Sequence, residues 1–482
     1  MRIRAIQRIL GLLLMLFSIT MLPPVAFALW YEEHTLPFIS AFLVTLATGT
    51  FFWFPVRRYR PDLKLRDGFV VVVMFWTVLG LAGSLPFLLS EQPSISITDS
   101  VFESMSGLTT TGATVISGLD SLPRSILYYR QQLQWLGGMG IIVLAVAVLP
   151  MLGVGGMQLY RAETPGPMKD NKLTPRITET AKALWYIYLA LTVACGLAYW
   201  LVGMTPFDAL AHAFSTVAIG GFSTHDLSMG HFNSALIEMV AVVFMFLSGV
   251  NYALHFLAWR GNSIQPYLAD TEFKFYALVL GAACVISAGY LYWMGTFDSF
   301  PSALHHGIFQ AVSIGTTTGF TTAEYHTWPG FLPAMLLLLS FIGGCAGSSG
   351  GGMKAIRVVM LLKQGGREIL RLVHPNAQIP VKINNKAIND RVVDSVWGFF
   401  SLYVVSFCVM ALILAATGLD LTTAFSAVAA CMNNLGPGLG DVGANYTSVN
   451  DVGKWVLCFA MLLGRLEIFT LLVLLTPAFW RK

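Results

Sequence analysis

The sequence LTTTGATV, residues 108–115, recurs with small changes as IGTTTGFT at residues 314–321. Each copy places three threonines before a glycine, in a chain that is 56% hydrophobic and only 11% charged. That composition lies far outside the range of soluble proteins. A polar glycine turn that occurs twice in a membrane-embedded chain indicates an internal repeat.

Ten apolar stretches are long enough for a helix to cross the hydrocarbon core, which takes about 20 residues. Their centres lie near Ile19, Val44, Phe75, Val143, Val193, Val243, Val285, Leu338, Val409 and Leu463. The first stretch follows the basic sequence MRIRAIQR, but it is long for the apolar part of a signal peptide, so we expect a retained helix. The sequence therefore predicts an all-α integral membrane protein.

Basic residues fall mainly on one side of these spans. With ten spans, the termini and alternate loops share a face that holds 25 of the 29 Lys and Arg residues. Arg124, Arg130 and Lys454 lie on the other face, and Arg465 lies within the last span. Cytoplasmic loops retain Lys and Arg, so we expect a multi-pass protein of the bacterial inner membrane with both termini in the cytoplasm. The net charge of +4 reflects this topology and gives no sign of nucleic-acid binding.

Four long connectors on the outer face follow one plan, in which a short semi-polar helix runs into a glycine. They read ITDSVFESMSGLTTTGATV, TPFDALAHAFSTVAIGGFST, FPSALHHGIFQAVSIGTTTGFTT and DLTTAFSAVAACMNNLGPGLG. The aligned glycines are Gly112, Gly221, Gly319 and Gly436. The residues nine positions before them are Glu103, His212, Gln310 and Ala427. The chain is thus predicted to contain four tandem repeats, each consisting of a span, a re-entrant pore helix, a glycine turn and a second span.

We expect an N-terminal helix pair at 1–67 and pore repeats at 68–160, 161–262, 263–375 and 376–482. Irregular backbone is tolerated at membrane depth only where protein buries it or where it lines an aqueous cavity. Four turns that face a common axis satisfy this condition together. Each pore helix then points its partially negative C-terminal end at the axis, which favours cations, and backbone carbonyls past that end can replace the water around an ion.

The four glycine turns, the extra helix pair and a later glycine-rich interruption resemble the Trk/Ktr/HKT superfamily of potassium transporters, and within it the bacterial TrkH family. The resemblance covers essentially the whole chain. It implies uptake of K⁺ through a potassium-selective pore within one subunit, with K⁺ as the transported ion and no cofactor in this chain. It also implies a homodimer and gating by a cytosolic nucleotide-binding regulator, TrkA, for which the basic loops at 161–182 and 354–391 are the expected docking surface.

The selectivity filter that the resemblance implies consists of each aligned glycine and the residue before it. These residues are Thr111, Gly112, Gly220, Gly221, Thr318, Gly319, Leu435 and Gly436. The second repeat departs from the pattern, because Ala218 and Ile219 stand where repeats 1 and 3 have threonines. Selectivity that rests on backbone oxygens survives this change, whereas selectivity that rests on hydroxyl groups does not.

The eighth apolar stretch is interrupted by SFIGGCAGSSGGGMK at 340–354. Its glycines are Gly343, Gly344, Gly347, Gly350, Gly351 and Gly352. Each interior glycine destabilises a helix by about 1 kcal/mol relative to alanine, so we expect the span to break; close helix packing through small residues is the alternative. The resemblance places an intramembrane gate here, near a basic residue of the last span, and Arg465 occupies that place. A buried charge needs compensation, so Arg465 is expected to face the pore, to contact loop carbonyls or to pair with Glu467.

Two motifs are also found in intramembrane proteases, namely GSSG at 347–350 and GLGD at 438–441. No base is placed opposite Ser349, and no second mid-membrane aspartate accompanies Asp441, so we expect no catalytic residues and no enzyme. A proton- or sodium-coupled cation symporter with the same filter remains the alternative function. The sequence leaves open the K⁺ to Na⁺ selectivity ratio, the coupled ion and the nucleotide that controls the regulator. It also leaves open the roles of Glu103, His212 and Gln310, for which hydrogen bonding or packing is favoured over catalysis.

Overall fold

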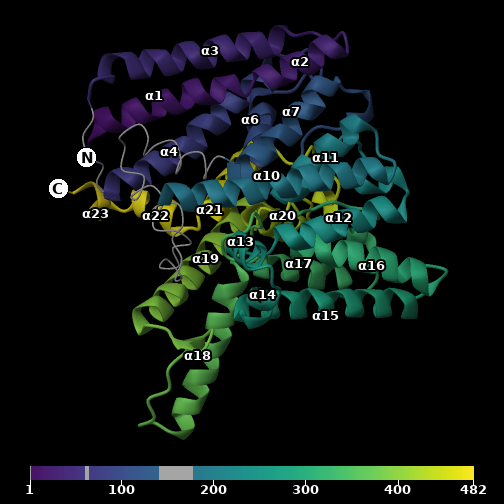
Figure 1. Ribbon diagram of the computed structural model, residues 1–482, viewed down its shortest axis with the longest axis vertical. Coiled ribbons are helices and arrows are strands. Elements are labelled where there is room, and N and C mark those ends of the chain that lie inside the picture. Colours follow the sequence, from purple (N-terminus) through teal and green to yellow (C-terminus); the bar gives the residue numbers. More distant parts are fainter. Residues whose placement is uncertain (1, 60–64, 141–176, 482) are drawn as a thin grey trace.

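The computed structural model describes residues 2–59, 65–140 and 177–481 (Figure 1). Helices dominate these ranges, and a two-stranded antiparallel hairpin joins β1 (Lys382–Ile383) to β2 (Lys386–Ala387). The span expected near Val143, the repeat boundary at 160/161 and most of the basic loop 161–182 lie outside the described residues. The long apolar helices and bent helix pairs agree with the predicted class, an all-α membrane protein.

The N-terminal helices form a pair along one edge of the molecule. The helices α1 (Ile3–Ile19) and α2 (Leu22–Trp30) together form one candidate span, and α3 (Leu36–Trp53) returns beside α1 (Figure 1). The two backbones touch where Gly11 meets Gly49, because a Cβ at Gly11 would lie 2.7 Å from the Gly49 carbonyl oxygen. Close approach of this kind needs small residues on both helices.

Each of the four following repeats contains a first span, a pore helix, a 3-10 turn and a second span. The first spans are α4 (Leu65–Gly83), α10 (Ile177–Leu201), α15 (Thr271–Trp293) and α19 (Asp390–Ala416). The pore helices are α6 (Ile97–Leu108), α11 (Pro206–Ala218), α16 (Phe300–Gly315) and α20 (Leu421–Met432). The 3-10 turns after the aligned glycines are η2 (Leu119–Ser121), η4 (Ser228–Phe232), η5 (Tyr325–Thr327) and η6 (Gly440–Val442).

The second spans are divided in every repeat. They are α7 (Arg124–Trp135) with η3 (Leu136–Gly140), α12 (Ala235–Ser248) with α13 (Tyr252–Gly261), α17 (Leu332–Ile342) with α18 (Ala355–Val373), and α21 (Asp451–Arg465) with α22 (Phe469–Leu475). The remaining short helices are η1 (Phe54–Val56), α5 (Leu85–Leu89), α14 (Gln265–Ala269) and α23 (Pro477–Trp480).

The predicted break in the eighth apolar stretch is confirmed, because α17 ends at Ile342 and α18 begins only at Ala355. The corresponding breaks in the other repeats were not predicted from the sequence. The second span of repeat 2 bends by 93°, that of repeat 4 bends by 119°, and that of repeat 1 is interrupted at Gly138, whose ψ is −108°. Within the described residues, six helices are long enough and apolar enough to cross a membrane, or up to eight if each bent pair is one span.

A side-chain oxygen caps the start of each pore helix. The capping residues are Ser96, Thr205, Ser299 and Asp420, and each side chain accepts a hydrogen bond from a backbone N–H in the first turn. Such caps satisfy N–H groups that have no partner within the helix. The turn signal that opens each connector in the sequence is therefore a helix cap in the structure.

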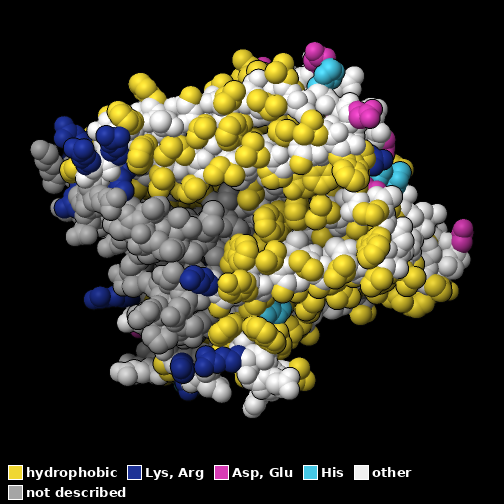
Figure 2. Space-filling model, turned by 45° about the horizontal axis from the view of Figure 1, so that its top comes forward, with side chains coloured by type: hydrophobic (Ala, Val, Ile, Leu, Met, Phe, Trp, Pro, Cys, Tyr) yellow, Lys and Arg dark blue, Asp and Glu magenta, His cyan; other side chains and the backbone are white. Residues whose placement is uncertain are grey.

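Charged side chains separate along the direction of the spans. Figure 2 shows hydrophobic side chains over the middle of the visible face, with Lys and Arg at the end where Figure 1 places both termini. Acidic side chains gather at the opposite end, with histidines beside them (Figure 2). A hydrophobic band between two polar ends is the arrangement expected of a membrane-spanning protein.

Candidate functional site

The four aligned glycines have the same backbone conformation. Their φ angles are +81° at Gly112, +78° at Gly221, +84° at Gly319 and +95° at Gly436. Glycine adopts such angles readily because it has no Cβ, whereas other residues do so at a cost. The spacing of these glycines in the sequence thus corresponds to a shared structural requirement.

These glycines meet in a closed ring, which we call the glycine ring (Gly112, Gly221, Gly319 and Gly436). A Cβ on each would collide with the carbonyl oxygen of the residue that precedes the glycine of the next repeat. The distances would be 2.1 Å from Gly112 to Gly220, 2.0 Å from Gly221 to Thr318, 2.1 Å from Gly319 to Leu435 and 2.7 Å from Gly436 to Thr111. The contacts run in the order of repeats 1, 2, 3 and 4 and then return to repeat 1, so the predicted turns do converge.

The pore helices end in the same hydrogen-bonded cap. The residue two positions before each glycine has a positive φ, at Thr110, Ile219, Thr317 and Asn434. The next N–H donates back to the carbonyl five residues earlier, at 2.8, 2.8, 2.8 and 2.7 Å in repeats 1 to 4. A left-handed residue followed by this bond is the Schellman motif, which satisfies a carbonyl at a helix end. A β-branched residue such as Ile219 is strained in this conformation, and strain of this kind concentrates at functional sites.

The threonine hydroxyls of repeats 1 and 3 bond to the protein itself. Thr109 Oγ1 lies 2.8 Å from Thr111 Oγ1 and donates to the carbonyl of Met105. Thr316 makes the same two contacts, with Thr318 Oγ1 at 2.7 Å and with the carbonyl of Val312. These hydroxyls are therefore engaged within their own turns, and repeat 2 forms the same backbone cap without them.

Glu103 forms a buried network that fixes the segment after Gly112. Its carboxylate pairs with Arg130 Nε at 2.8 Å and accepts hydrogen bonds from the Thr114 hydroxyl and the Val115 N–H, each at 3.0 Å. Both charged side chains are at most 1% exposed. Arg130 also donates to the Ser223 carbonyl of repeat 2 at 3.0 Å, so the network joins two repeats.

The corresponding positions of the other repeats have related roles. His212 Nε2 lies 2.9 Å from the Ser223 hydroxyl, two residues after Gly221, and Gln310 donates to the Ala323 carbonyl at 3.4 Å. Repeat 4 has Ala427 at this position and uses its neighbour Ser426, whose hydroxyl accepts from the Leu439 N–H at 2.9 Å. The position nine residues before each glycine, or its neighbour, thus anchors the chain that leaves the ring.

Several residues that hold the ring were not identified from the sequence. Gln134 donates to the Gly220 carbonyl at 2.6 Å and accepts from the Phe222 N–H at 3.1 Å. The Tyr446 hydroxyl donates to the Gly436 carbonyl at 2.6 Å. A signal for Gln134 existed in the polar run RQQLQW at 130–135, which is unusual beside an apolar span. No comparable signal marks Tyr446.

The glycine-rich loop, Gly343–Lys354, lies directly against the turns of repeats 3 and 4. The Gly351 N–H donates to the Thr317 hydroxyl at 2.7 Å, and the Gly352 N–H donates to the Asn433 carbonyl at 3.0 Å. A Cβ at Gly351 would lie 1.9 Å from that same carbonyl oxygen. The alternative of GxxxG packing within a continuous helix is wrong, because these glycines are needed for contact between a loop and the ring.

Arg465 lies beside this loop and bonds to three separate segments. Its guanidinium donates to the Thr110 hydroxyl and the Ser349 carbonyl, each at 3.3 Å. It also donates to the Gly137 carbonyl and, at 2.8 Å, to the Gly138 carbonyl, where the second span of repeat 1 breaks. Of the expected environments, contact with loop carbonyls is present. Glu467 pairs instead with Arg357 at the start of α18.

The protease-like motif is used structurally. The Ser349 hydroxyl lies 2.9 Å from the Tyr252 hydroxyl, which is a hydrogen-bond partner and no base of the kind that activates a serine. The loop is also tied down at both flanks, since Glu272 Oε1 accepts from the N–H groups of Ala346 at 2.7 Å and Ile356 at 3.0 Å.

The sequence model of TrkH, described as a cation transport protein, matches residues 34–482. The chain belongs to the TrkH family. It is 59% identical to the Trk system potassium uptake protein TrkH of Vibrio parahaemolyticus and 56% identical to that of Escherichia coli K12, in each case over 100% of both chains. It is 42% identical to the Trk system potassium uptake protein TrkG of Escherichia coli, covering 100% of this chain and 99% of the relative.

The crystal structure of the potassium transporter TrkH from Vibrio parahaemolyticus matches this fold with a TM-score of 0.91 and 56% sequence identity, covering 100% of both chains. The recognised family and the predicted fold class are therefore confirmed. The family consists of transport proteins, in agreement with the prediction that the chain is not an enzyme.

We predict that Glu103→Ala lowers the free energy of unfolding by about 3–5 kcal/mol, because it leaves the Arg130 guanidinium buried without its carboxylate. The measurement is thermal or chemical unfolding in detergent. Glu91→Ala is the control, since Glu91 is exposed. Equal stability of the two variants would show that the buried pair does not hold repeats 1 and 2 together.

Proposed function

We propose that this chain takes up K⁺ across the bacterial inner membrane, through a channel-like pore along the axis of the glycine ring. The observation that carries the proposal is the closed ring of four glycine turns, in which carbonyl oxygens of each repeat lie against the glycine of the repeat before it. The relatives named as potassium uptake proteins support the choice of ion.

In this proposal the backbone oxygens of the ring replace the hydration shell of the ion. The filter consists of Thr111, Gly112, Gly220, Gly221, Thr318, Gly319, Leu435 and Gly436. The hydroxyls of repeats 1 and 3 are engaged in bonds within the protein, so the conducting ligands are the carbonyls that all four repeats share. The C-terminal ends of four pore helices add a negative potential at the same place, which stabilises a dehydrated cation and disfavours anions.

We predict that Gly319→Ser weakens selectivity for K⁺ or stops flux, because a Cβ there would collide with the Leu435 carbonyl at 2.1 Å and the positive φ would be strained. Uptake of K⁺, Rb⁺ and Na⁺ into liposomes containing the purified protein measures this. Gly281→Ser is the matched control, since nothing lies within 4 Å of its Cβ position. If serine at all four ring glycines left the K⁺ to Na⁺ permeability ratio unchanged, the shared filter would be excluded.

The gate in this proposal consists of the glycine-rich loop, with Gly343, Gly344, Gly347, Gly350, Gly351 and Gly352, together with Arg465. The guanidinium connects the ring at Thr110 to the loop at Ser349, and its charge repels K⁺ more strongly in a low dielectric than in water. The loop residues between the flanks held by Glu272 contribute the mobile part, because glycines have no side chains to repack.

We predict that Arg465→Ala raises K⁺ flux in the absence of any regulator, because it removes both the positive charge and the bonds that hold the loop under the ring. Deletion of residues 347–349 should have the same effect. Arg260→Ala removes an exposed arginine of α13 and is the control. Arg465→Lys separates the two contributions, since it keeps the charge but cannot reach several acceptors at once. Wild-type basal flux in both the arginine-to-alanine and the deletion variants would rule out this gate.

We propose that a cytosolic nucleotide-binding regulator of the TrkA type docks on α18 and the segment after it. Figure 1 shows α18 extending away from the body of the molecule. Its end carries exposed apolar side chains, among them Leu372 at 84% and Val373 at 67%, next to the half-buried Arg371, which pairs with Glu368. An exposed apolar patch rimmed by charge is typical of a protein interaction site.

The family resemblance also leads us to propose a homodimer with both termini in the cytoplasm. The mass of the purified protein in detergent tests the oligomeric state.

We predict that Leu372→Asp combined with Val373→Asp weakens capture of the regulator from detergent solution at least tenfold, while K⁺ flux by the chain alone is retained. Leu227→Asp is the control, because Leu227 is also an exposed leucine, at 71%, but lies in the segment after Gly221 and not on α18. Unchanged capture would place the regulator elsewhere. Nucleotide-dependent gating by the chain alone would remove the need for a regulator.

A further inference from the structure

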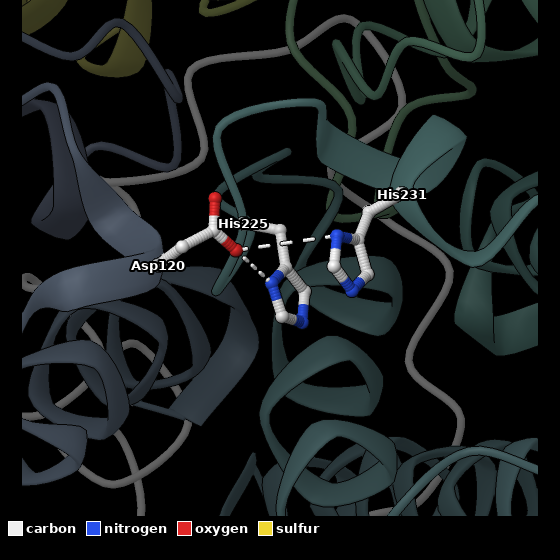
Figure 3. A group of neighbouring side chains, drawn as sticks. All are labelled: Asp120, His225 and His231. Carbon is white, nitrogen blue, oxygen red and sulfur yellow. Dashed lines mark hydrogen bonds and ion pairs between the residues drawn. The ribbon is translucent and has the colours of Figure 1, made fainter.

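A group of three side chains lies beyond the glycine ring, where the loops of repeats 1 and 2 meet. Asp120 belongs to η2, His231 to η4, and His225 to the segment between Gly221 and η4. Figure 3 shows the Nδ1 atoms of both imidazoles turned toward the same oxygen of Asp120. The distances are 2.5 Å from His225 and 4.0 Å from His231, and one potential ligand atom from each residue lies within 4.8 Å of the other two.

This donor set fits a transition-metal ion of the zinc type. Zn²⁺ binds imidazole nitrogen and carboxylate oxygen at about 2.0–2.2 Å in a tetrahedron, which places neighbouring ligand atoms roughly 3.3–3.6 Å apart. The observed separations from the Asp120 oxygen fall on either side of that value. Hard ions such as Mg²⁺ and Ca²⁺ prefer oxygen ligands only. The exposed side chains of Asp120 and His231, at 50% and 41%, leave a route for the ion from solvent.

A second carboxylate is placed to orient His225. Its Nε2 atom is buried, has no hydrogen-bond partner among the described residues, and lies 3.5 Å from Asp208 Oδ1. Asp208 is itself held by the hydroxyls of Thr224 at 2.8 Å and Thr205 at 2.7 Å. A metal-ligating histidine commonly donates its other ring N–H to a carboxylate, which fixes the tautomer and raises the basicity of the ligand. Asp208 is therefore placed to orient His225 as a metal ligand.

In this structure His225 Nδ1 lies 2.5 Å from the Asp120 oxygen, and the His225 and His231 rings stack with their centroids 3.5 Å apart. Because two ligands of one tetrahedral Zn²⁺ ion lie farther apart than 2.5 Å, the three side chains turn apart to receive the ion.

We propose that Asp120, His225 and His231 bind one Zn²⁺ ion, with water as the fourth ligand and Asp208 as the positioning carboxylate of His225. The ion joins the segment eight residues after Gly112 to the segment four residues after Gly221. It thus links the loops of repeats 1 and 2 next to the glycine ring.

A second group, Glu238, His305 and His306, provides an internal comparison. Its His306 Nδ1 already lies 3.0 Å from the Thr322 hydroxyl, and its Glu238 carboxylate is only 5% exposed, compared with 50% for Asp120. We therefore assign zinc to the first group, and use the second as a control with the same number of histidines.

The test is equilibrium dialysis of the metal-free, full-length protein in detergent against ZnCl₂, with bound zinc measured by elemental analysis. We expect one Zn²⁺ per chain that excess Mg²⁺ does not displace. His225→Ala with His231→Ala should abolish it, and His305→Ala with His306→Ala should retain it. Asp208→Asn keeps all three ligands and should weaken binding about 10–100-fold.

A matching readout comes from thermal unfolding, because an ion that binds only the folded state raises the midpoint. Zinc should raise the midpoint of the wild type and of the His305/His306 variant, but not that of Asp120→Ala, a second variant that spares both imidazoles. The proposal is overturned if the wild type retains no zinc, if Mg²⁺ competes equally, or if the His225/His231 variant binds zinc with wild-type affinity. Loss of zinc on substitution of His305 and His306 alone would transfer the site to the second group.

Discussion

The contact of each ring glycine with the carbonyl of the next repeat is the constraint on which the rest of this structure depends. At this contact the space for a side chain is already occupied by a backbone oxygen, at 2.0–2.7 Å from a Cβ position. Backbone that is not helical is costly in a membrane unless it is buried or lines water. Four turns that close on one another meet that condition jointly, and none of them meets it alone.

The layer around the ring consists of polar contacts that cross between repeats. Arg130 reaches from repeat 1 to the Ser223 carbonyl of repeat 2, and the Tyr325 hydroxyl of repeat 3 donates to the Gly438 carbonyl of repeat 4 at 2.9 Å. Lys454 of repeat 4 pairs with Asp99 of repeat 1 at 2.6 Å. Buried polar groups are costly without partners, so this layer makes the ring specific to one arrangement of the four repeats.

The breaks in the second spans bring backbone groups close to the ring. In repeats 1 and 4 a glycine of the second span packs against the pore-helix carbonyl four residues before the ring glycine: Cβ atoms at Gly137 and Gly464 would lie 1.8 Å from Leu108 and 2.0 Å from Met432 carbonyl oxygens. In repeat 3 the break is longer and becomes the glycine-rich loop. One side chain, Arg465, then connects the ring turn at Thr110, the glycine-rich loop at Ser349 and the break at Gly138. The loop and the ring are thus physically linked.

The sequence by itself determined the membrane class, the fourfold repeat, the position of each pore helix and the break after Ile342. These features depend on composition, on periodic apolar length and on glycine, which act locally and are visible in the chain. Tertiary structure decided the rest. The breaks at Gly138 and in the second spans of repeats 2 and 4 arise from packing against another repeat. Other features join residues that are distant in sequence or belong to different elements. They are the Gln134 and Tyr446 contacts, the pairing of Glu467 with Arg357, and the meeting of Asp120 with His225 and His231. No local pattern specifies such partners, because their positions exist only once the four repeats have closed into a ring.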